Sequence, residues 1–398
     1  MKFIITVFVL LLLTTTKTGA QVLPPLPIPI GAGSAQVWGD SIYVIGGSNN
    51  WGGNIVYPRI YRFNGTSWAY HDSIPDSNVW DVETVIKGNE IFLIAGWPSG
   101  PRLTRKYNLS TRLWTSLAAL PTSQSFTWGT TAEVIGDSIY LVNPGGNTYR
   151  YSIPGNSWTE LPNAGRTGSN DLSSIAFNGE MYVIGFRDSS FVKYSPQTGT
   201  WSTLAKSPYQ VGACAMGIVN EQIYCIGGNL NGGTGAFYNT VIAYNILTNS
   251  WRTDSLRISG KRHWMARAEY RGGLYVLGGI DSLANSVNTV EQIIPQGTSS
   301  VRKITNTLPR NFELLQNYPN PFNPSTTIRY RVASASEITL SVFDVLGREV
   351  ASLFKGWQAA GEYGFDFNAA ERGLSSGIYF YRLISKERIE TKKMILAK

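Results

Sequence analysis

The apolar residues of this chain gather in short runs that end near glycine and return every 42–51 residues. Each run is rich in Ile, Val and Leu and carries Tyr or Phe at its third position. Runs of this length and composition, bounded by glycine, predict β-strands rather than helices. The six runs are 41–47, 90–96, 138–143, 180–185, 222–228 and 273–279.

A second pattern follows the apolar run in five of the six units. A Tyr or Phe precedes a polar turn, and a tryptophan and then a Leu-Pro or similar segment come next. The tryptophans are Trp68, Trp114, Trp158, Trp201 and Trp251. A fixed period of this length predicts repeated four-stranded sheets that bury their faces only by packing together.

These repeats resemble the kelch repeat, which implies an all-β fold with a six-bladed kelch-type β-propeller over residues 21–294. The sixth unit has no tryptophan strand. Residues 23–27 match the end of that strand in the other units, so we expect the N-terminal segment to complete blade 6 and close the ring. The alternative is a disordered proline-rich leader.

The last part of the chain, residues 312–398, alternates polar and apolar positions in short runs and predicts a small immunoglobulin-like β-sandwich. Its motifs, from N-Y-P-N-P-F-N-P-S-T-T-I to S-G-I-Y-F-Y-R-L and a lysine-rich end, resemble the type A C-terminal sorting domain of the type IX secretion system. That resemblance implies the secretion machinery as a partner. The matched motif residues include Asn320, Pro321, Gly347, Arg348, Gly377 and Lys393. The alternative is an ordinary immunoglobulin-like accessory domain.

The two remaining segments are a leader and a linker. Lys2, the apolar run 3–13 and the small residues 18–20 predict a signal peptide over 1–20, cleaved before Gln21, with a retained membrane anchor as the alternative. Residues 295–311 are predicted to be a linker. No later segment is apolar enough to span a bilayer, so we expect no transmembrane segment in the mature chain, which is secreted or held at the outer-membrane surface.

Charge argues against nucleic acid as a partner. The net charge is +8, but residues 21–294 hold 18 basic and 17 acidic residues, and the tail 310–398 holds 12 basic and 9 acidic residues. A nucleic-acid-binding protein concentrates its basic residues on the working domain. The repeat region is nearly neutral.

The chain has two cysteines, Cys214 and Cys225, on consecutive predicted strands. Export to an oxidising environment permits a disulfide between them. The alternative is a pair of buried thiols that pack as small apolar residues.

No catalytic motif stands out, and kelch proteins include both enzymes and binding proteins. A copper oxidase resembling galactose oxidase needs two histidine ligands, whereas this chain has only His71 and His263, and His71 lies in an outer strand far from the axis. We therefore expect no metal and no cofactor. Sugar isomerisation, as in kelch N-acetylneuraminate epimerases, remains an alternative without a motif of its own.

One aligned column of the repeats suggests a binding site. Each unit has an aromatic residue in its second strand, and the column is the position twelve residues before it. We expect this position to lie in the loop that leads from one blade into the next, at one mouth of the central channel. The column is Gly31, Trp80, Trp128, Asn170, Gly212 and His263. With its neighbours it predicts a glycan- or protein-binding mouth, in which tryptophans stack and polar groups hydrogen-bond. The predicted ligand-binding residues are Trp80, Trp128, Trp264, Asn170, Asp171, Arg166, Arg262 and His263. The alternative is that the tryptophans are plugs between blades.

Overall fold

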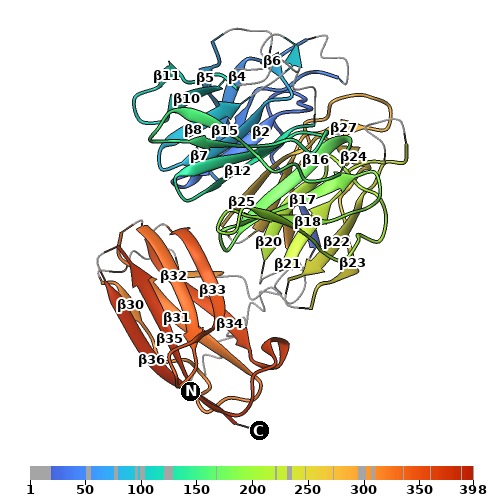
Figure 1. Ribbon diagram of the computed structural model, residues 1–398. Coiled ribbons are helices and arrows are strands. Elements are labelled where there is room, and N and C mark those ends of the chain that lie inside the picture. The colour runs from blue at the N-terminus through green and yellow to red at the C-terminus, as the bar shows by residue number, and fades with distance from the viewer. Residues whose placement is uncertain are drawn as a thin grey trace, which may run out of the picture.

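The computed structural model describes the chain from residue 19 to residue 397, apart from 51–54, 76–78, 95–96, 99–103, 121–128, 167, 220–221, 231–234, 247, 272, 295–301, 306–308, 310, 335, 359 and 387. The described part is almost entirely β-strand. Figure 1 shows two bodies, a propeller coloured from blue to yellow and a sandwich in orange and red.

The first three blades are four-stranded antiparallel sheets in which successive strands pair. Blade 1 contains β2 (Ser34–Trp38), β3 (Ser41–Ile45), β4 (Arg59–Phe63) and β5 (Trp68–Ser73). Blade 2 contains β7 (Glu83–Lys87), β8 (Glu90–Ile94), β10 (Thr104–Asn108) and β11 (Leu113–Ser116). Blade 3 contains β12 (Thr131–Ile135), β13 (Ser138–Val142), β14 (Thr148–Ser152) and β15 (Ser157–Leu161).

The other three blades follow the same plan, except that the last takes one strand from the start of the chain. Blade 4 contains β16 (Gly168–Phe177), β17 (Glu180–Phe186), β18 (Val192–Ser195) and β19 (Thr200–Thr203). Blade 5 contains β20 (Ala215–Val219), β21 (Gln222–Ile226), β22 (Thr240–Asn245) and β23 (Ser250–Arg257). Blade 6 contains β25 (Ala266–Tyr270), β26 (Gly273–Leu277), β28 (Val290–Ile294) and β1 (Gly19–Leu23). Two short ribbons, β6 (Val79–Trp80) with β9 (Trp97–Pro98) and β24 (Arg262–His263) with β27 (Ile280–Asp281), lie beside the blades.

The six blades form a closed ring, as the sequence predicts. The innermost strands contact one another in the order β2, β7, β12, β16, β20, β25 and back to β2. Strand β1 pairs antiparallel with β28, and the register places Gln21 opposite Gln292 and Leu23 opposite Val290. The prediction that the N-terminal segment supplies the outer strand of blade 6 is therefore confirmed.

The repeated tryptophans join neighbouring blades. Each packs against the aromatic residue of its own blade, as Trp158 does on Tyr151 at 5.1 Å between ring centroids. Each also donates its indole N–H to a carbonyl in the segment that ends the preceding blade. The five acceptors are the carbonyls of Pro24, Ser73, Ala118, Pro162 and Ala205. Trp68 donates to the Pro24 carbonyl, so the N-terminal segment accepts the tryptophan bond of blade 1. The segments that end blades 1 to 4 accept the same bond from the blade that follows each of them.

The glycine pairs after the second strands are required by close backbone packing. Gly47 has φ +102° and Gly228 has φ +97°, in the left-handed half of the map that side chains avoid. A Cβ atom on Gly228 would lie 2.6 Å from the carbonyl oxygen of Gly212. The glycine therefore lets this strand end pass close to the loop that enters blade 5.

The C-terminal body is a sandwich of two four-stranded sheets, as the sequence predicts. Leu340, Tyr330 and Phe365 are among the side chains that fill its core. One sheet has the order β29 (Arg302–Thr305), β34 (Gly361–Asn368), β31 (Ser325–Val332), β30 (Glu313–Leu314). The other has the order β33 (Glu349–Gln358), β32 (Ser336–Phe343), β35 (Gly377–Ser385), β36 (Ile389–Leu396), and one 3-10 turn, η1, covers Ala370–Arg372. Residues 302–305 fall in the stretch that the sequence assigns to the linker, but they pair with β34 as an edge strand.

The closing strand leads to a truncation experiment. A chain beginning at Gln21 keeps the pairs between 21–23 and β28, whereas a chain beginning at Pro24 leaves the edge of β28 open. An open edge exposes unpaired backbone groups and promotes association. We expect the shorter chain to melt several degrees lower and to aggregate, with the thermal midpoint and light scattering as the measurements. Identical melting of the two chains would contradict a stabilising role for β1.

Candidate functional site

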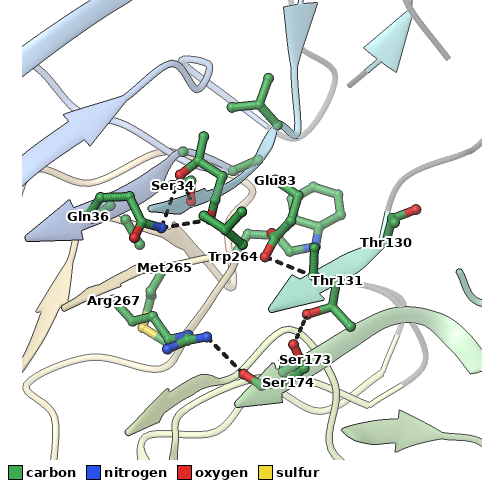
Figure 2. A pocket seen from close by; sticks show the side chains of 18 of the residues that line it. Ser34, Gln36, Glu83, Thr130, Thr131, Ser173, Ser174, Trp264, Met265 and Arg267 are labelled. Atoms are coloured by element: carbon green, nitrogen blue, oxygen red, sulfur yellow. Dashed lines mark hydrogen bonds between the residues drawn. The ribbon is translucent and has the colours of Figure 1, made fainter. Parts of the chain in front are cut away.

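The inner strands surround a cavity of ≈ 380 Å³ on the propeller axis. It is lined by residues of all six blades, mainly 32–37, 81–86, 129–134, 171–174 and 264–269. Figure 2 shows Gln36, Glu83, Thr131, Ser174 and Arg267 arranged around this space. These five side chains are all polar, so the site is suited to a ligand rich in hydrogen-bonding groups.

One side of the cavity is organised by Arg267. Its guanidinium donates to Glu133 Oε1 at 2.6 Å and to the Ser174 carbonyl at 2.9 Å. The Ser174 hydroxyl donates to the same Glu133 oxygen at 3.0 Å and lies 2.6 Å from the Thr131 hydroxyl. Burial alone would lower the pKa of Arg267, but the carboxylates of Glu133, Glu83 and Glu269 more than offset this and raise it.

Glu83 faces Arg267 from the other side of the cavity. Its Oε1 accepts the Ala132 N–H at 3.2 Å. Burial raises the pKa of Glu83 to about 8, although the Arg267 charge opposes the rise. The nearby Glu133 carboxylate adds to it. At pH 7 the Glu83 carboxyl group is therefore mostly protonated and can donate a hydrogen bond.

Two further carboxyl groups lie at the end of the cavity where the loops enter the inner strands. Burial raises the pKa of Asp81 to about 6, and Asp81 Oδ2 accepts the Gly129 N–H at 3.1 Å. Burial and the Asp81 charge raise the pKa of Asp171 to about 7. Neither oxygen of Asp171 accepts a hydrogen bond from a described residue, although its side chain is buried.

The predicted tryptophan rim differs from what the structure shows. Trp80 exposes 3% of its surface and Trp264 exposes 9%, and their rings meet edge to face at 6.0 Å. They pack with Ala32, Ala213 and Ile280 in one apolar cluster. The expectation of open stacking faces is corrected for these two residues: they plug the blades together, the alternative that the sequence left open. Trp264 still lines the cavity.

Arg262 and His263 are inside blade 6 rather than at a mouth. Arg262 forms a buried ion pair with Glu291 and donates to the Gly278 carbonyl at 2.8 Å. Burial lowers the pKa of His263 to about 3, so the imidazole is neutral; it stacks on Trp264 at 4.8 Å. Their expected hydrogen bonds to a ligand are corrected, because both residues are almost fully buried and engaged.

Asp171, another of the predicted binding residues, lines the cavity. Arg166 is at the surface, where its guanidinium binds Asp188 at 2.9 Å and the Thr203 hydroxyl at 3.0 Å. Asn170 lies in β16, but its side chain is outside the part of the chain that the structure describes. Trp128 lies outside the described residues. Among the predicted residues whose side chains the structure describes, only Asp171 and Trp264 line the cavity.

The sequence reasoning missed Arg267, Glu133, Ser174 and Gln36, and it noted Glu83 only as a possible carboxylate. These residues lie three to five positions after the aligned column, on the innermost strands. The sequence holds a pattern that could have identified them: charged residues interrupt a short apolar strand, as in A-R-A-E-Y at 266–270. On an innermost strand, such residues face the channel.

The two cysteines are buried and carry free thiols, so the structure holds the alternative to the predicted disulfide. A hydrogen bond with the Cys225 thiol lowers the pKa of Cys214, and burial raises the pKa of Cys225. We expect alkylation of the denatured, unreduced protein to add two labels, as read by intact mass. Labelling that needs prior reduction would contradict this.

The sorting motif residues are largely structural. Asn320 Oδ1 accepts the Ile395 N–H at 2.9 Å, which ties the proline-rich segment around Pro321 to β36. Gly347 has φ +78° in the turn that Asp344 and Arg348 close through a 2.7 Å bond. Gly377 begins β35 and Lys393 is exposed on β36. A receptor contact by Arg348 or Lys393 stays a proposal.

Comparisons with known proteins agree with this architecture. Residues 316–397 match the family described as secretion system C-terminal sorting domain, and residues 212–253 match the Kelch motif. A solved structure described as "Structure of YjhT" superposes with a TM-score of 0.56 at 14% identity, covering 68% of this chain and 96% of that chain. At that identity the likeness shows the fold alone. No curated protein matches the sequence.

The fold and the motifs together define a kelch-type β-propeller protein. Its C-terminal sandwich is a sorting domain of the type IX secretion system, so the chain is exported to the cell surface or secreted. The sorting domain also makes the secretion machinery a partner. Within the described part of the chain, no helix has the length and hydrophobicity needed to cross a bilayer.

Proposed function

We propose that this exported propeller is a binding protein that takes a glycan residue into its central channel. The observation that carries the proposal is the polar cavity of ≈ 380 Å³, lined by carboxyl, hydroxyl, amide and guanidinium groups of the inner strands. A volume near the lower end of the range for small-molecule pockets suits one or two sugar rings and excludes a folded protein domain.

The hydrogen-bonding pattern supports a polyhydroxylated ligand. Gln36 donates to the Thr84 carbonyl at 2.6 Å, and Thr84 donates to the Ser34 hydroxyl at 2.7 Å, so these groups are held in place before a ligand arrives. On the opposite wall Arg267 is fixed by Glu133 and Ser174. Sugar hydroxyls both donate and accept, so they fit a wall of mixed donors and acceptors.

A glycan array with two variants tests this proposal. We expect the intact protein to bind a subset of glycans and Glu83→Ala to lose at least about tenfold in affinity, because a buried hydrogen-bonding partner is removed. The matched control is Glu160→Ala, an exposed position on β15. A complete lack of glycan binding, or equal binding by both variants, would reject the channel as a glycan site.

A carbohydrate-active enzyme resembling kelch N-acetylneuraminate epimerases is a second candidate, favoured by one observation. Glu83, with a pKa of about 8, can give a proton at neutral pH. It shares the cavity with Glu133, which is ion-paired to Arg267. Titratable groups displaced from their usual pKa in one cavity suit acid and base roles. Proton NMR of N-acetylneuraminate anomers distinguishes the two functions: interconversion faster than in buffer, lost in Glu83→Ala, would favour the enzyme.

A further inference from the structure

We propose that the end of the channel at Asp171, Asp81 and Trp264 binds a primary ammonium group, so that the preferred ligand is an amino sugar with a free amine. This inference rests on the proposed function, because it specifies which glycan the channel prefers. It is carried by a ring of equivalent residues, one from each blade, that encircles this end of the cavity. We call the ring the collar; it consists of Ala32, Asp81, Gly129, Asp171, Ala213 and Trp264.

The backbone of the collar bonds to itself. Ala213 N–H donates to the Asp171 carbonyl at 3.2 Å, Trp264 N–H to the Ala213 carbonyl at 3.1 Å, and Ala32 N–H to the Trp264 carbonyl at 3.0 Å. Five of the six residues have φ between +49° and +79°, a conformation that alanine and tryptophan rarely adopt. These amide donors are occupied by the collar itself and are not free to bind a ligand anion.

The main polar groups among the collar's side chains are the carboxyl groups of Asp81 and Asp171. The members at 32, 129 and 213 are alanine or glycine and add no polar atom. Asp171 exposes 1% of its surface, and neither of its oxygens meets a donor from a described residue. The indole N–H of Trp264 lies near enough to lower the pKa of Asp171, but it completes no hydrogen bond either. Burying a carboxylate without hydrogen-bond partners costs free energy, so a ligand group with several donors would be stabilised by binding there.

Charge favours a cation over a neutral group. The cavity is lined by one guanidinium, that of Arg267, and by five carboxyl groups, those of Asp81, Glu83, Glu133, Asp171 and Glu269, of which Glu83 is mostly protonated at pH 7. The Arg267 guanidinium is 2.6 Å from the Glu133 carboxylate, so its positive charge is paired with Glu133. An ammonium group carries three donors and a positive charge, which match the acceptors of Asp171 and Asp81.

An organic cation fits better than a metal ion. Among the described residues, no group of three or more His, Cys, Asp or Glu side chains could hold a metal ion.

Calorimetric titration of the full chain with glucosamine, N-acetylglucosamine and glucose tests the inference. We expect glucosamine to bind at least about tenfold more tightly than either neutral sugar, and Asp171→Asn to remove that preference. Binding of the amine should also release protons at pH 7, visible as a heat that depends on the buffer, because the cation favours ionised aspartates. The control Glu160→Ala keeps the preference, and a melting curve of each variant checks that it is folded.

The possible outcomes separate the inference from the proposed function. Equal affinity for the three sugars, unchanged by Asp171→Asn, would overturn the ammonium site and leave a glycan-binding channel. Binding of lysine methyl ester without any binding of sugars would support the ammonium site and reject the glycan. A preference for calcium chloride over every amine, lost in Asp171→Asn, would overturn the inference in favour of a metal ion.

Discussion

Replacing Glu291 with alanine is expected to lower the free energy of unfolding of the propeller by about 3–5 kcal/mol. Glu291 exposes 1% of its side chain and Arg262 exposes 3%. Without Glu291, the Arg262 charge stays buried, and its remaining partners among the described residues are the carbonyls of Gly278 and Thr289. The Ser259 N–H and hydroxyl also lose their acceptor.

The matched control removes one member of an exposed pair. Lys87 and Asp137 are 3.0 Å apart, but their side chains are 44% and 78% exposed, so Asp137→Ala should cost about 1 kcal/mol or less. The urea midpoint at pH 7 measures both effects. If both variants unfold at the same midpoint as the unchanged protein, the Arg262 pair does not hold blade 6 together.

Asp171→Asn is expected to stabilise the protein at pH 8 and to leave it nearly unchanged at pH 4. Burial and the Asp81 charge raise the pKa of Asp171 to about 7 in the folded state, whereas the unfolded chain has the ordinary value of 3.8. The folded state therefore holds the proton more tightly. Its stability falls as the pH rises from about 4 to about 7, and the full cost remains at higher pH.

The size of this effect follows from the same pKa difference. One pKa unit corresponds to about 1.4 kcal/mol, so ionising Asp171 costs up to about 4 kcal/mol at pH 8. Asparagine has nearly the same shape and no charge, so the variant avoids that cost. Melting curves from pH 4 to pH 8 measure it, with Asp137→Asn as the exposed control. A variant that is destabilised at pH 8 would contradict the description of Asp171 as a carboxylate without partners.

The fold could be predicted in detail because each blade repeats the same structural residues. The pattern of Tyr or Phe, turn and Trp recurs because each of the five repeated tryptophans makes the same two contacts, as Trp201 does with Tyr194 and the Pro162 carbonyl. The closing strand was predictable for the same reason: residues 23–27 resemble the exit segments, and Pro24 accepts the bond from Trp68. Structural constraints that act in five of the six blades leave a readable repeat.

The site was less predictable because each blade contributes a different side chain to the channel. Arg267 aligns with Thr84 and Ser174 of other blades, and also with an alanine or a methionine, so no repeat marks the position. The aligned column identified the loop positions instead. Trp80 and His263 are buried there and pack against neighbouring side chains. Sequence alone does not tell a tryptophan that stacks on a ligand from one that packs between blades, because both need a flat apolar side chain.

A crystal structure of the propeller with the glycan selected on the array tests the central claim most directly. We predict density for the sugar on the propeller axis, within hydrogen-bond distance of Glu83 and Arg267. Density confined to the outer faces of the blades or to the sandwich, with the channel holding only water, would contradict it.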